Sequence, residues 1–271
     1  MAGAKEYVIG GVITAIGAGL FAYGFNRMSR YRLIADTPTS KIRSMAMGLV
    51  EIHGNVKATE TIKTPFSQSA CVYYKYEIKE YRKHTSTDSK GRSRTTYSWD
   101  TVGRGERRIC FNAKDDTGEV PVKPEGAEFN VPVKKVFLQK AGLFGAFNTI
   151  LGALKNWDNQ KTTAIDVAKW KLTPLDPKQR VSFGSRVGDR KYYEYYIEPD
   201  ENLFILGTAA NEGANKVVLK KGENEKTYMI SNRSEKELVK GLKLQMIAFF
   251  AIGGIVFLGG ILLILYFAGV I

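Results

Sequence analysis

The residues able to do acid–base, nucleophilic or metal chemistry are few and scattered. The chain has two His and two Cys, namely His53, His84, Cys71 and Cys110. A structural zinc needs clustered ligands, and none of these four is close to another in sequence. A nucleophile needs a base within reach, but one histidine falls on the polar side of an expected strand and the other in a basic loop. We therefore expect no catalytic residue and no metal site.

Two further motifs resemble chemical sites and are better explained as turns or loops. Gly103-Arg104-Gly105 lacks the following glycine, lysine and helix that a phosphate-binding loop requires. Asp115-Asp116-Thr117-Gly118 begins with aspartate and ends with glycine, which is typical of a tight turn between two strands. The sequence predicts no bound cofactor at either motif.

Basic residues outnumber acidic ones, 40 Lys and Arg against 27 Asp and Glu, for a net charge of +13. Such a charge suits nucleic acid or an anionic membrane. Part of it gathers around Lys83–Ser98, a polar segment expected to be a long hairpin tip. The residues concerned are Lys83, Lys90, Arg92, Arg94, Arg104, Arg107 and Arg108. No recognised nucleic-acid signature accompanies them, so we expect no nucleic acid. A membrane or acidic-partner surface and an ordinary solvated loop both stay open.

Two long stretches carry no charged side chain, Tyr7–Phe25 and Met246–Ile271. As helices rising ~1.5 Å per residue, each reaches across a hydrocarbon core of about 30 Å. The first stretch could also be a signal peptide, but it is long and preceded by a single lysine, so an uncleaved anchor is expected. The sequence thus predicts transmembrane helices at 7–25 and 246–271.

Basic residues flank these stretches mainly on one side, since the outer flanks carry only Lys5. Arg27, Arg30 and Arg32 follow the first, and Lys236, Lys240 and Lys243 precede the second. Lys and Arg near span ends predict the cytoplasmic side, so we expect a two-pass membrane protein with a cytoplasmic central domain and both termini outside. The six residues are candidates for contact with the anionic bilayer surface. Cytoplasmic cysteines stay reduced, whereas the opposite topology would permit a Cys71–Cys110 disulfide.

Small residues recur at helical spacing in the first stretch. Gly11, Ala15 and Gly19 form one row, and the adjacent row is Gly10, Thr14, Ala18 and Ala22. Such rows let helices approach closely, so we expect this face to pack on another span. The partner is either the second span of the same chain or a neighbouring protein, which predicts a homo-oligomer or a membrane-protein partner.

Short alternating segments dominate residues 38–232 and predict strands. They are Leu49–Lys57, Ala70–Ile78, Arg108–Ala113, Glu119–Val122, Lys191–Pro199, Leu203–Ala209, Lys216–Lys220 and Thr227–Ile230. The expected fold class is a membrane protein in which two transmembrane α-helices flank a β-rich α+β domain, built as an OB-like barrel or two small β units.

Helical periodicity interrupts these strands between residues 136 and 165. Leu143, Phe144, Phe147, Leu151 and Leu154 recur at helical spacing, and the uncharged part is too short to span a bilayer. This inserted helix either lies in the membrane interface or caps the domain core. Ser234 with Glu237 resembles a capping box, which predicts an amphipathic connecting helix at 233–245 that continues into the second span.

Several of these segments, taken in order, resemble the GIDE domain, also called the "beside a membrane" (BAM) domain. The motifs are Thr37-Pro-Thr-Ser-Lys-Ile-Arg-Ser, Gly48-Leu-Val-Glu-Ile-His-Gly, Ser69-Ala-Cys-Val-Tyr-Tyr-Lys-Tyr-Glu, Asp115-Asp-Thr-Gly, Tyr192-Tyr-Glu-Tyr-Tyr-Ile-Glu-Pro and Leu206-Gly-Thr-Ala. The resemblance covers roughly Pro38 to Lys240. It implies the membrane-flanked domain of a mitochondrial RING-type ubiquitin ligase and of related prokaryotic membrane proteins.

That ligase carries a RING, which binds two zinc ions through eight Cys and His ligands. The present sequence holds only four such residues and stops at Ile271, so we expect the resemblance to imply architecture more than ubiquitin transfer. The expected function is a non-enzymatic, membrane-anchored scaffold or sensing module that binds a protein or ligand. One alternative is a ligase component that acts with a separate catalytic partner. Another is an oligomeric two-span pore, which the nearly apolar second span disfavours.

Overall fold

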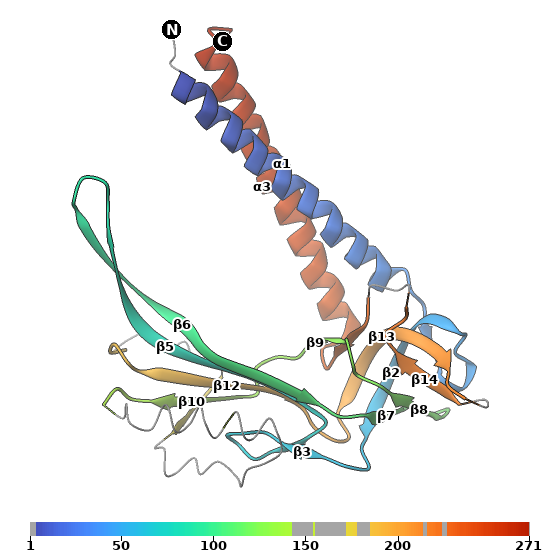
Figure 1. The fold of residues 1–271 in the computed structure, drawn as a ribbon. Coiled ribbons are helices and arrows are strands. Elements are labelled where there is room, and N and C mark those ends of the chain that lie inside the picture. The colour runs from blue at the N-terminus through green and yellow to red at the C-terminus, as the bar shows by residue number, and fades with distance from the viewer. Residues whose placement is uncertain are drawn as a thin grey trace. The chain divides into compact units, whose positions relative to one another are not determined.

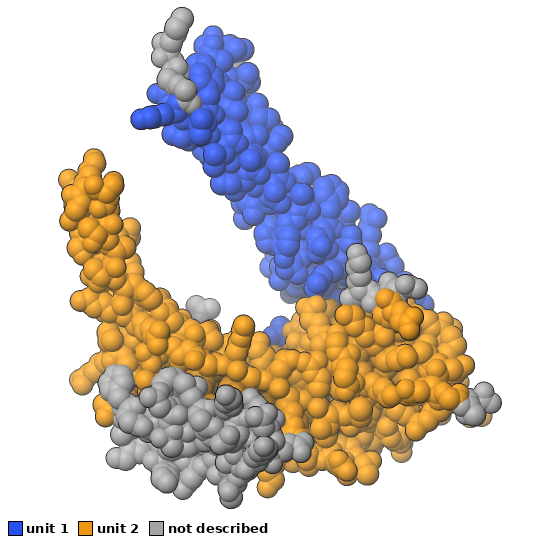
Figure 2. Space-filling model, in the orientation of Figure 1, with its two compact units in different colours: residues 1–39, 233–271 blue, residues 40–232 orange. Residues whose placement is uncertain are grey.

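The computed structural model describes residues 4–142, 154, 172–177, 185–213, 216–223 and 227–270. The chain divides into two compact units, which Figure 2 colours separately. One unit comprises residues 1–39 with 233–271, and the other comprises residues 40–232. Each unit is described on its own.

Two antiparallel helices, α1 (Ala4–Ala35) and α3 (Glu235–Phe267), form the first unit (Figure 1). Both are long and apolar enough to cross a membrane. Helix α1 continues past Phe25 because arginine is a good helix former, and it ends just before Pro38. Helix α3 joins the segment from Glu235 to the second apolar stretch without a break, and the Ser234 hydroxyl caps it by accepting from the Glu237 N–H at 3.3 Å.

Glycines let the two helices approach at backbone distance. A Cβ on Gly17 would lie 2.3 Å from the Phe257 nitrogen, and one on Gly253 would lie 2.5 Å from the Phe21 nitrogen. A Cβ on Gly260 would likewise lie 2.6 Å from the Thr14 nitrogen. The contact therefore repeats every seven residues on α3, as in closely packed membrane helices.

The row Gly11, Ala15 and Gly19 is not part of this contact. All three residues are exposed, and a Cβ on either glycine would meet nothing within 4 Å. Of the adjacent row, Gly10 and Thr14 do face α3. The interpretation that the first row packs on the chain's own second span is thus wrong, while packing on a neighbouring chain stays a prediction.

The second unit contains a closed five-stranded barrel. Its strands are β2 (Gly48–Lys57), β7 (Phe111–Lys114), β8 (Glu119–Val122), β13 (Asn202–Asn211) and β14 (Val217–Lys220). They pair in the order β2–β7–β8–β14–β13, and β13 pairs with β2 to close the ring. Only the β8–β14 pair in this ring is parallel. The barrel expected from the alternating segments is confirmed.

Alternate side chains of β2 point into the barrel and fill part of its interior. Val50, Ile52 and Val56 point inward and are buried, and Ile205 of β13 and Leu219 of β14 complete the layer. Short flanking elements extend the barrel at its edges. They are β1 (Thr39–Ser40), the 3-10 turn η1 (Ile42–Ser44), β9 (Glu128–Asn130) and β15 (Met229–Ser231).

A second, antiparallel sheet arises from two insertions into the barrel. Between β2 and β7 the chain forms β5 (Tyr73–Thr87) and β6 (Ser93–Arg108). Between β8 and β13 it forms β10 (Lys135–Gln139), β11 (Thr173–Leu175) and β12 (Arg190–Ile197). The order is β11–β10–β12–β5–β6. A small ladder of β3 (Ile62–Lys63) and β4 (Ala70–Cys71) precedes it. The long hairpin expected around Lys83–Ser98 is the β5–β6 pair (Figure 1).

One face of this sheet holds a second aromatic core. Tyr74, Ile78 and Tyr192 are buried there around Phe66, whose ring lies 5.1 Å edge-on from that of Tyr192. Leu154 is helical and buried in the same cluster, so this residue of the expected apolar helix packs into the core. Leu143, Phe144, Phe147 and Leu151 lie outside the described residues.

Candidate functional site

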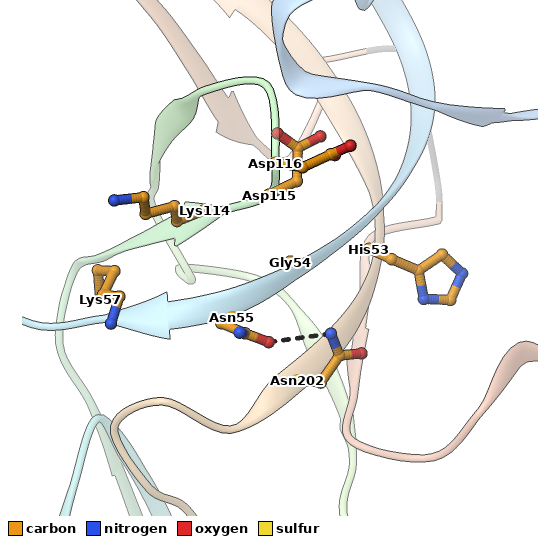
Figure 3. A pocket seen from close by; sticks show the side chains of 8 residues that line it. All are labelled: His53, Gly54, Asn55, Lys57, Lys114, Asp115, Asp116 and Asn202. Atoms are coloured by element: carbon orange, nitrogen blue, oxygen red, sulfur yellow. Dashed lines mark hydrogen bonds between the residues drawn. The ribbon is translucent and has the colours of Figure 1, made fainter.

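A polar pocket of about 510 Å³ opens on the barrel surface where β2, β7 and β13 meet (Figure 3). It is lined by His53, Gly54, Asn55, Lys57, Lys114, Asp115, Asp116 and Asn202. Because β2 alternates, the residues that flank its buried Ile52 and Val56 turn outward and supply His53, Asn55 and Lys57. The pocket is therefore the outer side of the same strand whose inner side fills the barrel.

The pocket lies where β2 changes partners. Asn55 is opposite Asn202 in the pairing with β13 and opposite Lys114 in the pairing with β7. The Asn202 amide nitrogen donates to the Asn55 side-chain oxygen at 3.0 Å (Figure 3). Gly54 precedes this point, and a Cβ on it would lie 3.1 Å from the Lys114 carbonyl oxygen. A glycine here allows β7 to close onto β2, which sets the pocket floor.

Asp115 shapes the rim of the pocket. Its Oδ1 accepts from the N–H groups of Thr117 at 2.7 Å and Gly118 at 2.9 Å, and its Oδ2 accepts from the Ile42 N–H at 2.9 Å. Burial alone would raise the pKa of Asp115, but these hydrogen bonds outweigh it and lower the pKa to about 2. The carboxylate is thus a fixed anion that ties η1 to the β7–β8 turn, as expected for a turn former.

Other charges at the pocket are arranged in pairs. Lys41 contacts Asp116 at 2.6 Å, and Lys57 pairs with Asp200. Figure 3 shows the two lysines of the lining on one side, His53 on the other and the asparagine pair between them. The eight lining residues include no Ser, Thr or Cys. This set of ammonium, carboxylate, amide and imidazole groups suits reversible binding of a polar ligand or peptide.

The six basic residues predicted to meet an anionic surface lie at one end of the helix pair. Arg27, Arg30 and Arg32 occupy the last third of α1, and Lys236, Lys240 and Lys243 occupy the first turns of α3. The helices run antiparallel, and the rings of Tyr23 and Phe249 meet 4.8 Å apart close to this end. Arg27 stacks on the Tyr23 ring at 4.9 Å, while the three lysines are exposed.

The two thiols and the second histidine take structural or solvent-exposed positions. Cys71 and Cys110 are free, the first buried and the second exposed. Burial raises the pKa of Cys71 to about 12, which makes it unreactive. His84 lies 2.7 Å from the Asp100 carboxylate on the exposed hairpin.

Sequence reasoning missed the burial of acidic side chains, of which Glu194 is the clearest case. Glu194, in the middle of Tyr192-Tyr-Glu-Tyr-Tyr, is fully buried and accepts from the Phe66 N–H at 2.6 Å and the Ser67 N–H at 3.1 Å. Burial raises the pKa of Glu194, and the hydrogen bonds from this loop oppose the shift. A charge-bearing residue inside an alternating aromatic strand was the available signal. Its role is to fasten the loop that carries Phe66 onto β12.

The sequence motifs of this chain resemble a known domain family, and comparison with known proteins tests that resemblance. No curated protein and no solved structure matches the chain. A family model does match, the one named GIDE and described as an E3 ubiquitin ligase, over residues 79–265. The match runs from the middle of β5 into α3 and covers more than half of the chain. The resemblance drawn from the motifs is confirmed: the chain belongs to the GIDE family.

Proposed function

We propose that this protein is a membrane-anchored binding module that acts without chemistry of its own. Helices α1 and α3 cross the bilayer as a pair, and the barrel domain between them recruits a protein or ligand at the membrane surface. The observation that carries the proposal is the glycine-lined contact of two apolar helices, which precede and follow a compact β-domain in the sequence. A chain held at both ends in this way is suited to presenting a surface rather than to diffusing to a substrate.

The polar pocket of the barrel is the proposed recruitment site. Closed five-stranded barrels of the OB type bind ligands on their outer strands and loops, which is where this pocket lies. Lys114 is exposed at its edge, and Asn55 and Asn202 offer both donors and acceptors. A few hydrogen bonds from these side chains to an acidic or amide-rich segment of a partner would be enough for a reversible complex.

We place the barrel domain in the cytoplasm with both chain ends outside. The support is the shared basic end of the helix pair, because Lys and Arg next to spans favour the cytoplasmic side. The exposed row of Gly11, Ala15 and Gly19 supports self-association of the spans, since small residues allow a second helix pair to approach.

The test is gentle detergent purification of the full chain, with mass measurement of what remains bound. Lys114→Glu is compared with Lys135→Glu, an equal change at an exposed lysine of β10. We expect the bound component to be lost with the first variant and kept with the second. A chain that carries no component, or equal effects of the two variants, would contradict the proposal.

A second candidate function follows from the family description, E3 ubiquitin ligase. In this version the chain recruits a separate catalytic partner and positions it at the membrane. The same purification distinguishes the two, because a ubiquitin-conjugating or ubiquitin-like-conjugating enzyme among the bound proteins supports the ligase version. Its absence, with another protein bound through Lys114, supports the scaffold.

A further inference from the structure

The outer part of the β5–β6 hairpin has two faces of unlike chemistry. Direct partners across the two strands share a face, so the pairing assigns every side chain. Tyr81 is opposite Trp99, and Lys83 is opposite Tyr97. Together with Lys191 of β12, these four residues form what we call the aromatic–lysine face.

Contacts within the aromatic–lysine face are close. The rings of Tyr81 and Tyr97 stack 5.9 Å apart, and the Lys191 ammonium lies 4.4 Å from the centre of the Trp99 ring. Nearer the centre of the sheet, Lys79 and Lys75 of β5 each lie 5.5 Å from a tyrosine ring of β12, and both contact the Glu77 carboxylate between them, at 3.9 and 3.7 Å. Cations held over aromatic rings keep their charge toward solvent while their stems cover apolar surface.

The opposite face of the same hairpin is balanced in charge. Arg82 contacts Glu80 at 2.9 Å, and His84 contacts Asp100 at 2.7 Å. Its remaining members are small polar residues and Arg94, which is opposite Ser86. No tyrosine or tryptophan lies on this face between residues 80 and 100, a range that is fully described.

We infer that the aromatic–lysine face binds the anionic phospholipid headgroups of the membrane in which the helices are anchored. Tyr and Trp are the side chains that concentrate at membrane–water interfaces, because they have an apolar body and a polar tip. An exposed lysine beside them, here Lys83, is attracted to an anionic leaflet by about fivefold in binding, and the half-buried Lys191 adds to the positive charge of the face. The face offers both features and carries no acid between Lys79 and Thr101.

The inference rests on the proposed anchoring of the helices, and the anchoring is also what favours lipid over other anions. A tethered domain meets its own bilayer at a high effective concentration, so a weak surface contact is enough to hold it. An acidic protein or a single-stranded nucleic acid would have to bind the same few side chains from free solution.

The experiment uses the full chain in nanodiscs of neutral lipid or of neutral lipid with one-third phosphatidylglycerol. Thr95 and Thr96 are neighbours on opposite faces of β6, and Thr95 is opposite Thr85 on the aromatic–lysine side. Thr95→Cys and Thr96→Cys are labelled with bimane in a Cys110→Ser background, since Cys71 is buried. Quenching by a headgroup nitroxide lipid then reports which side touches the bilayer.

We expect strong quenching at position 95, weak quenching at position 96, and dependence on the anionic lipid that is lost in high salt. Lys83→Glu removes one positive charge and adds a negative one, so it should weaken the lipid contact reported at position 95 by more than about fivefold. Arg94→Glu, an equal charge change on the other face, should leave it unchanged. Equal quenching at the two positions, or equal effects of the two reversals, would overturn the inference.

Two further readouts separate this inference from the proposed anchoring. A label at Leu258→Cys, exposed on α3, should be quenched by acyl-chain nitroxides in both lipid mixtures if the helix spans. Quenching there without quenching at position 95 refutes the hairpin contact and leaves the anchor standing. Displacement of the hairpin from anionic discs by a short single-stranded DNA or an acidic peptide, at concentrations that leave the discs intact, would assign the face to that ligand instead.

Discussion

The Asp115 side chain makes both a local turn contact and a long-range tertiary contact. Its Oδ1 closes the β7–β8 turn, while its Oδ2 reaches the Ile42 N–H, 73 residues earlier in the chain. The turn itself could be predicted from Asp-Asp-Thr-Gly, because the chemistry is local. The contact to Ile42 could not, since no spacing in the sequence relates the two segments.

Asp115→Asn should therefore destabilise the barrel domain. The aspartate accepts hydrogen bonds at both oxygens, whereas the amide nitrogen of asparagine cannot accept one. We expect a loss of about 1.5–3 kcal/mol at pH 7, the range for a hydrogen bond to a charged acceptor. The folded-state pKa, about 2, is below the unfolded value near 3.9, so the stabilisation is complete above pH ~4 and declines as pH falls toward 2.

Denaturant unfolding of the full chain in detergent measures this effect. The control is Asp116→Asn, which removes only an exposed pair with Lys41 and should cost at most about 1 kcal/mol. The difference between the two variants should shrink on acidification. A difference that grows below pH 4 would refute the assigned role of Asp115.

At the scale of elements, the helix contact depends on which glycine row faces the partner. A Cβ on Gly253 would lie 2.5 Å from the Phe21 nitrogen, while one on the adjacent Gly254 would meet nothing within 4 Å. Gly253→Ala should push the helices apart at a cost of about 1–3 kcal/mol, whereas Gly254→Ala should not. Both changes raise helix propensity equally, so they form a matched pair.

Spin-label distances between one exposed site on each helix provide the measurement. The distribution should shift to longer distances and broaden for Gly253→Ala alone. An unchanged distribution in that variant would show that the helices do not use this contact in a bilayer.

Sequence patterns predicted these elements unevenly. The two apolar stretches indicated helices at once, but small residues occur on several rows of α1, and only the crossing with α3 selects the row of Gly10, Gly17 and Gly24. The β5–β6 hairpin was expected from its polar tip. Strand β5 ends at Thr87 and β6 begins at Ser93, so both strands extend farther than the alternation of the sequence suggested. Both faces of the hairpin are exposed there, so the sequence shows no alternation of hydrophobic and polar residues.

For the whole molecule, alternating segments predicted a β-rich domain but not how the barrel closes. The parallel β8–β14 pair joins Val122 to Leu219, and the second sheet is assembled from two insertions far apart in the chain. The burial of Glu194 also depends on a long-range contact, because its hydrogen-bond partner Phe66 is 128 residues away in the chain. Such pairings depend on tertiary packing, which period and propensity do not encode.

The proposed topology gives a prediction at this scale. In sealed inverted membrane vesicles, protease should cut the exposed hairpin tip between Thr87 and Ser93, because the cytoplasmic side faces out. In intact cells the tip should be protected. Cleavage from outside intact cells would reverse the placement of the barrel domain, and a soluble protein trapped inside the vesicles, digested in parallel, checks that the membrane is intact.

Strand β6 has one further consequence. Within the described part of the chain it pairs with β5 alone, so its outer side presents free backbone groups that could template pairing with another copy. An extra residue, Val102, interrupts the register opposite Ile78–Lys79, and Arg94, Arg104 and Arg107 punctuate the strand. Bulges and charges of this kind discourage edge-to-edge growth. Under the proposed membrane anchoring, neighbouring copies would meet often in the plane of the bilayer, and these features would keep their β6 edges from pairing into fibres.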